Sequence, residues 1–135
     1  MKVVLDADVL IGALDGSDPH HPRSRALFSG WHAVGDTRLV SAVNLSEVLV
    51  APAAHDRRLR AAREAIGALG VVIQQPSEAI AVHAARLRAR HPISLPDAYC
   101  LATASRTGGA VATFDRKVLG AAEAEEIPLA PTAVE

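Results

Sequence analysis

The chain has 135 residues, a net charge of −1 and a hydrophobic content of 50%. A chain of this length buries roughly two-thirds of its unfolded surface on folding, so it needs neither disulfides nor a structural metal for stability. It contains only one Trp, one Tyr and two Phe, which argues against RNA-recognition or OB-type modules that stack bases on exposed aromatic side chains.

The first 52 residues alternate between apolar runs of strand length and segments with helical spacing. His20 and His21 precede Pro22 at the expected start of a helix, so we expect both imidazoles to face solvent. In chain order, the pattern predicts a strand over 3–5, a helix from 9, a loop over 15–19, a helix over 20–32, a strand over 38–42 and a helix from 44 that ends near 52.

The remaining residues continue this alternation. Gly70 and Gly108 suit helix ends, Ser77 suits a helix N-cap, and Pro96 suits the first turn of a helix. We therefore expect a helix over 55–69, a buried strand over 71–73, a helix from 77 that ends before 92, a helix from 96 to 108, a strand over 110–113 and a short fifth strand over 127–129.

Strands that alternate with helices favour a parallel sheet covered by helices on both faces. A core of Ala, Val, Leu and Ile is typical of such sheets. We predict an α/β fold with one domain over residues 1–135, namely a three-layer α/β/α sandwich around a central parallel sheet of four to five strands. Ligands of such sheets bind outside the carboxyl ends of the strands.

Four acidic residues lie where predicted strands or helices begin or end. Asp6 and Asp115 follow the first and fourth strands, whereas Glu47 and Asp97 lie early in helices. Each acid also has a purely structural interpretation. Asp6 and Asp115 suit caps of a helix or turn, Asp97 suits the positive end of a helix dipole, and residues 44–47 match a capping box.

Taken together, the four acids favour a metal site. If they share one rim of the sheet, two carboxylates roughly 5 Å apart repel each other by about 3 kcal/mol at an effective dielectric constant near 20. Such a cluster either raises carboxyl pKa values or binds a divalent cation. All-oxygen ligation suits Mg²⁺, with Mn²⁺ as a substitute, and a site of this kind can activate water for displacement at phosphorus.

Four motifs resemble, in their order and separation, those of PIN-domain ribonucleases, and they cover residues 3–11, 44–48, 95–102 and 112–116. The resemblance implies that metal binding and catalysis depend on Asp6, Glu47, Asp97 and Asp115, with Thr113 as a supporting polar residue. The sequence departs from the family pattern at Asp8, where relatives more often carry Ser, Thr or Asn. Asp8 either adds charge at the metal or caps the helix, and we prefer a supporting role.

The compact size of the chain resembles the VapC toxins of bacterial toxin–antitoxin pairs. This resemblance implies a Mg²⁺-dependent endoribonuclease that hydrolyses RNA through a metal-activated water, is inhibited by a cognate VapB-like antitoxin and forms a homodimer. Arg116 and Lys117 follow Asp115 directly and are candidates for contacts with substrate phosphate, although a solvated turn explains them equally well. We expect a cytoplasmic protein with no membrane partner, because the single Cys100 suits a core thiol in a reducing compartment and no apolar run reaches membrane-spanning length.

Two other functions remain open on the sequence alone. Asp6-Ala7-Asp8 after a strand also suits a haloacid-dehalogenase-type phosphatase, with Asp6 as nucleophile and Asp8 as acid/base. That fold requires a later Gly-Asp-x-x-x-Asp motif, which this sequence lacks, and Glu47 would have no role in it. The second alternative is a non-catalytic, receiver-like or protein-interaction domain that binds Mg²⁺. The third strand lacks the acid at its end that a phospho-receiver needs.

Overall fold

The computed structural model describes residues 1–132 and contains a central sheet of four parallel strands. In register, Val4 lies beside Leu39 on one side and beside Val111 on the other. The strand order is β3-β2-β1-β4, so the chain places two strands on one side of β1 and then returns to its other side. The strands are β1 (Lys2–Leu5), β2 (Thr37–Ser41), β3 (Val71–Gln74) and β4 (Ala110–Ala112).

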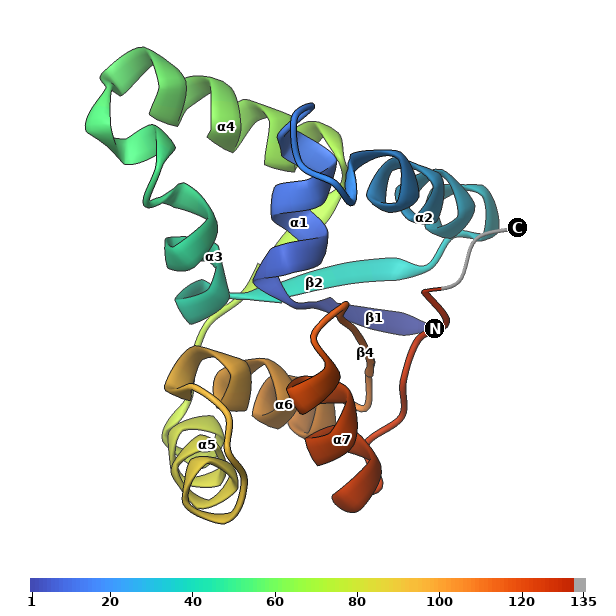
Figure 1. The fold of residues 1–135 in the computed structure, drawn as a ribbon, viewed down its shortest axis with the longest axis vertical. Coiled ribbons are helices and arrows are strands. Elements are labelled where there is room, and N and C mark those ends of the chain that lie inside the picture. Colours follow the sequence, from blue (N-terminus) through green and yellow to red (C-terminus); the bar gives the residue numbers. More distant parts are fainter. Residues whose placement is uncertain (133–135) are drawn as a thin grey trace.

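Helices cover both faces of the sheet, with α1 to α4 on one face and α5 to α7 on the other (Figure 1). Among the described residues, no helix is long and apolar enough to cross a membrane. The helices are α1 (Ala7–Leu14), α2 (His21–Val34), α3 (Ala42–Leu49), α4 (Asp56–Ala68), α5 (Glu78–Arg90), α6 (Leu95–Thr107) and α7 (Arg116–Ala124), and a 3-10 turn covers Pro52–Ala54.

The two faces of the sheet bury alternate residues of the same strands. Val3 and Leu5 pack with α1 to α4, whereas Val4 packs with α5 to α7. Successive side chains of a strand point to opposite faces, so three consecutive apolar residues require helices on both sides. The three-layer α/β/α arrangement predicted from the sequence is therefore confirmed, with four strands in the sheet.

Several predicted boundaries were wrong, and the errors have physical reasons. The strand over 71–73 is not buried, because β3 lies at the edge of the sheet and leaves Val72 and Ile73 exposed to 52% and 43%. The fifth strand is reduced to an isolated bridge between Val111 and Leu129. Helix α3 begins at Ala42 rather than Asn44, since the Ser41 hydroxyl accepts a hydrogen bond from the Asn44 amide and caps the helix.

Candidate active site

The carboxyl ends of β1 and β4 lie beside each other where the strand order reverses, which is the usual ligand site in open α/β sheets. Asp6 follows β1 and is buried, with an exposed fraction of 3%. Its backbone amide donates to the Ala112 carbonyl of β4 over 2.9 Å. Its Oδ1 accepts a hydrogen bond from the Ala7 amide over 2.9 Å, so Asp6 also serves as the N-cap of α1.

Thr113 connects two of the predicted acids. Its buried hydroxyl donates to Oδ2 of Asp6 over 2.7 Å and accepts from the Asp115 amide over 3.0 Å. The Asp115 carboxylate then accepts from the amides of Lys117 and Val118 at 2.8 and 3.4 Å and caps α7. The structure therefore places Thr113 where it orients both Asp6 and the start of α7.

Asp8 lies in the first turn of α1 and reaches the loop after β4. Its Oδ2 accepts a hydrogen bond from the Phe114 amide over 3.0 Å. Its Oδ1 is buried and has no hydrogen-bond partner among the described residues. Asp6, rather than Asp8, caps α1. Of the two roles considered for Asp8, helix capping is therefore wrong, and its carboxylate instead holds the loop that carries Asp115.

Glu47 and Asp97 come from two helices that pack against each other, α3 and α6. The Ser94 hydroxyl caps α6 by accepting from the Asp97 amide over 3.2 Å, so Asp97 occupies the first helical turn as expected. Asn44 donates from Nδ2 to Oε1 of Glu47 over 3.2 Å and to the Pro96 carbonyl over 3.0 Å. The capping-box interpretation of residues 44–47 was wrong, because α3 is capped three residues earlier.

The electrostatics of this edge disfavour negative charge. Burial, reinforced by the charge of Asp8, raises the pKa of Asp6 from 3.8 to about 7. Burial also raises the pKa of Asp8, and the nearby Asp115 adds to that effect. Partial burial raises the pKa of Glu47; the hydrogen bond from Asn44 opposes this rise and the charge of Asp97 adds to it. The acids thus repel one another as neighbours, from Glu47 at one end to Asp115 at the other.

The donor set fits a hard divalent cation by its chemistry, since every candidate ligand is a carboxylate oxygen. A buried carboxylate oxygen without a partner, as in Asp8, is a further sign of an unsatisfied acceptor at this edge. Within residues 1–132, however, no three His, Cys, Asp or Glu side chains are gathered closely enough to hold a metal ion. The acids at this edge are therefore of the right chemical type for a hard cation and lie where ligands of such sheets bind. Their side chains are not close enough together to form a complete set of metal ligands.

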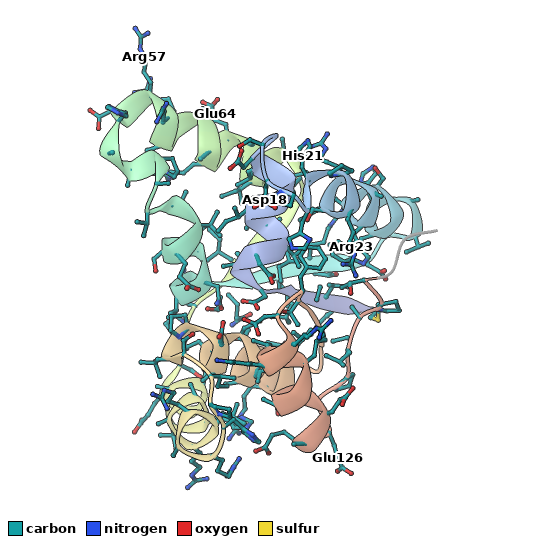
Figure 2. The ribbon with its side chains drawn as sticks, in the orientation of Figure 1. Asp18, His21, Arg23, Arg57, Glu64 and Glu126 are labelled. Atoms are coloured by element: carbon teal, nitrogen blue, oxygen red, sulfur yellow. The ribbon has the colours of Figure 1, made fainter. Side chains whose placement is uncertain are left out.

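The basic side chains are distributed more widely than the acids. Arg116 and Lys117 are exposed in the first turn of α7, directly after Asp115. Arg57 extends from α4 away from the rest of the molecule (Figure 2). Arg116 and Lys117, which were singled out from the sequence, are therefore at the acidic edge, whereas Arg57 is not.

Residues at the N-terminus of α2 pack against the loop after β4. The sequence did not predict this contact. The His20 ring stacks on Phe114 with 4.3 Å between ring centroids, and the Arg23 guanidinium lies 4.6 Å from the centre of the same ring. The His21 Nδ1 lies 2.8 Å from the Gly12 carbonyl of α1. The expectation that His20 and His21 face solvent was therefore wrong, because both are partly buried by contacts distant in the sequence.

Asn44 was also missed as a site residue. An Asn directly before a helix is usually a cap, and the sequence was interpreted in that way. Ser41 was the available signal: if Ser41 caps the helix, Asn44 lies inside it, where Asn is unfavourable and needs a specific partner. Cys100, by contrast, is fully buried one turn after Asp97, as expected of a core thiol.

Comparison with known proteins identifies this arrangement. The PIN domain family matches residues 3–124 of the chain, whereas comparison with curated proteins gave no match. Among solved structures, FitAcB from Neisseria gonorrhoeae is 21% identical with a TM-score of 0.71, over 96% of this chain and 97% of that one.

Two further structures show the same fold at low identity. VapC20 from Mycobacterium tuberculosis, described as a toxin that cleaves the sarcin–ricin loop, is 18% identical with a TM-score of 0.72, over 88% of this chain and 94% of that one. VapBC-1 from nontypeable Haemophilus influenzae is 14% identical with a TM-score of 0.72, over 98% of each chain. Because the family match spans most of the sequence and includes all four acids, the chain belongs to the PIN domain family.

Proposed function

We propose that this protein is a Mg²⁺-dependent endoribonuclease and the toxin of a VapC-type toxin–antitoxin pair. The observation that carries the proposal is Asp6, a buried carboxylate whose pKa is raised to about 7 beside Asp8 and Asp97. Burying a carboxylate among other acids costs stability. Such a cluster is hard to explain unless a cation compensates it in the working enzyme.

The proposed roles follow from the geometry of the edge. Asp6, Glu47, Asp97 and Asp115 would hold the ion, which when bound supplies positive charge against phosphate and lowers the pKa of water. Thr113 fixes Oδ2 of Asp6 through its hydroxyl. Asp8 holds the backbone of Phe114 and so fixes the loop that leads to Asp115. The exposed Arg116 and Lys117 lie where they can bind the RNA backbone.

Sequencing of RNA 5′ ends after exposure to the purified protein tests this proposal. Wild type with Mg²⁺ or Mn²⁺ should generate defined new 5′-phosphate ends, and Asp6→Asn or Asp97→Asn should remove them while the fold is retained. Glu126→Gln is a matched control, because Glu126 follows the end of α7 that is distant from the acids (Figure 2). Cleavage by Asp97→Asn at the wild-type rate, in protein free of host nuclease, would overturn the assignment.

A cognate antitoxin is the proposed protein partner. FitAcB and VapBC-1 support it by their fold and names, and this chain leaves apolar side chains exposed at Val50, Val72 and Ile73. Beside them, a cavity of about 440 Å³ is lined by residues of α3, α4 and β3. Co-expression with a candidate VapB-like antitoxin should give a stable complex that lacks nuclease activity. Sedimentation of the isolated chain separately tests the expected homodimer.

The two alternative functions lose support from the same residues. A phosphatase of the kind considered gives Glu47 no role, although Glu47 lies on α3 at the acidic edge, where the charge of Asp97 acts on it. A receiver-like domain does not account for the Glu47–Asp97 pair on α3 and α6. Trapping a phospho-aspartate at Asp6 would revive the phosphatase, and Mn²⁺ binding without cleavage of any RNA pool would favour a non-catalytic domain.

A further inference from the structure

Asn44 is a fully buried polar residue inside α3, with an exposed fraction of 0%. Its backbone amide is satisfied by the Ser41 hydroxyl over 3.1 Å, so its side chain is not required to cap the helix. Asn lowers helix stability because it competes for backbone hydrogen bonds. A buried Asn at this position therefore calls for a role outside the helix.

The side-chain amide of Asn44 joins two helices. Nδ2 donates to Oε1 of Glu47 over 3.2 Å and to the Pro96 carbonyl over 3.0 Å. Both partners are acceptors, so only the nitrogen of the amide can face them, and its orientation is fixed by chemistry. Glu47 lies one turn later on α3, and Pro96 directly precedes Asp97 on α6.

This bridge opposes the tendency of Glu47 and Asp97 to separate. Both are acidic side chains on the packed helices α3 and α6, so their like charges repel each other. Glu47 is also exposed, so its side chain would otherwise sample several rotamers. A donor that binds the Glu47 carboxylate and the backbone next to Asp97 at the same time restricts both the rotamer and the spacing of the two helices.

We infer that Asn44 is a positioning residue that holds the Glu47 carboxylate against the start of α6 and thereby preassembles the Glu47–Asp97 half of the cation site. The inference rests on the proposed function, because it assigns Asn44 a role toward the proposed metal. Its Oδ1 is buried with no partner among the described residues. A residue selected only for packing would be better replaced by Leu, which leaves no acceptor unpaired.

Mn²⁺ affinity tests the inference without relying on nuclease activity. Free Mn²⁺ is measured by electron paramagnetic resonance with wild type, Asn44→Leu, Glu47→Gln and the double variant. We expect Asn44→Leu to weaken Mn²⁺ binding by roughly 10- to 100-fold, as for other residues that orient metal ligands. In the double variant, the loss should be no larger than for Glu47→Gln alone, because Asn44 acts through Glu47.

A matched control separates this role from general loss of stability. Thr103→Val also removes a buried hydrogen bond, from the Thr103 hydroxyl to the Tyr99 carbonyl within α6, and should leave Mn²⁺ affinity within twofold of wild type. Asn44→Ser, which cannot span both partners, replaces Asn44→Leu if the latter does not fold. Unchanged affinity in the Asn44 variants, or losses that multiply in the double variant, would refute the inference.

The possible failures are distinguishable. If wild type binds Mn²⁺ but cleaves no RNA, the proposed nuclease fails while the Mn²⁺ comparison still decides the role of Asn44. If wild type binds no Mn²⁺, the proposed metal site and the role of Asn44 both fail. If Mn²⁺ binding and RNA cleavage are normal in Asn44→Leu, only the role of Asn44 is wrong.

Discussion

The acidic edge has two halves that are built differently. In the strand half, Asp6, Asp8 and Asp115 lie next to β1 and β4, and each accepts a hydrogen bond from a backbone amide. In the helix half, Glu47 and Asp97 lie on α3 and α6, and the Glu47 carboxylate is held by a side chain, that of Asn44. The carboxylates of the strand half are therefore held by backbone amides just beyond the ends of β1 and β4, whereas Glu47 in the helix half is held by a side chain that joins two helices.

The two halves also differ in how strongly burial disfavours the ionised form of their carboxyl groups. Asp6 is buried and its pKa is raised to about 7, while Glu47 remains exposed and its pKa is raised less strongly by partial burial. Asp6 is fixed to the sheet through its own backbone amide, which donates to the Ala112 carbonyl of β4. The strand half thus contains the most strongly disfavoured charge, that of Asp6, whereas the helix half is more exposed and its Glu47 carboxylate is held by the side chain of Asn44.

The largest effect is expected for Asp6→Asn in metal-free protein. The rise from 3.8 to about 7 corresponds to about 4 kcal/mol at neutral pH. A raised carboxyl pKa means that the folded state binds the extra proton between these values, so wild-type stability falls as pH rises from about 4 to about 7. Asp6→Asn removes this loss, and it should be more stable than wild type at pH 8 in urea unfolding with chelator.

The pH dependence provides the control for this experiment. The difference between Asp6→Asn and wild type should shrink to less than half at pH 5, because the wild-type carboxyl is then mostly protonated in the folded state. Saturating Mg²⁺ should also reduce the difference at pH 8 by stabilising wild type. Equal stability of the two proteins at pH 8 would show that the strand half carries no electrostatic strain.

A smaller effect is expected for Thr113→Val, which keeps the shape of the side chain and removes its hydroxyl. Oδ2 of Asp6 and the amide of Asp115 both lose their partner, which should cost about 1–3 kcal/mol in urea unfolding. Thr103→Val is the matched control, because its hydroxyl bonds only to a helical carbonyl. If both variants lost equal stability, Thr113 would not be a special link within the strand half.

The strand half was largely predictable from sequence. Apolar runs of strand length end at Asp6 and before Asp115, and parallel strands bring such ends to one edge. The hydroxyl of Thr113 lies in the same run. The pattern could not predict which atoms form hydrogen bonds with one another. The hydrogen bond from the Phe114 amide to Asp8 joins residues 106 positions apart, so no local spacing encodes it.

The two acids of the helix half were predictable from the sequence, but the hydrogen bonds of Asn44 that hold this half together were not. Glu47 and Asp97 stood out as charges near helix starts, yet the start of α3 was placed at Asn44 because Asn is a common cap. The choice between Ser41 and Asn44 depends on where β2 ends, and β2 is fixed by pairing with β1 and β3. The prediction that β3 is buried was wrong for a related reason. Three consecutive apolar residues do not reveal whether a strand is central or at the edge of a sheet.

Phe114→Leu tests whether side chains or the backbone fix the strand half. The substitution removes the stacking with His20 and the contact with Arg23, which should cost about 0.5–1.5 kcal/mol in urea unfolding. The Phe114 amide that binds Asp8 is retained, so Mn²⁺ affinity should stay within twofold of wild type. A tenfold loss of Mn²⁺ affinity would mean that the aromatic contact, rather than the amide, positions the loop.

The smallest effect is expected for Lys117→Ala in RNA binding, measured in an Asp97→Asn background to prevent cleavage. Lys117 is exposed beside the strand half, and after the substitution its backbone amide still donates to Asp115, the N-cap of α7. Loss of one phosphate contact should lower RNA affinity modestly and reduce the salt dependence of binding by about 0.7 in log–log slope. Arg57→Ala is the control, because Arg57 points away from the molecule on α4 (Figure 2), and it should change neither quantity. If Arg57→Ala matched Lys117→Ala, RNA would bind through diffuse charge, and the strand half would not direct the phosphate backbone.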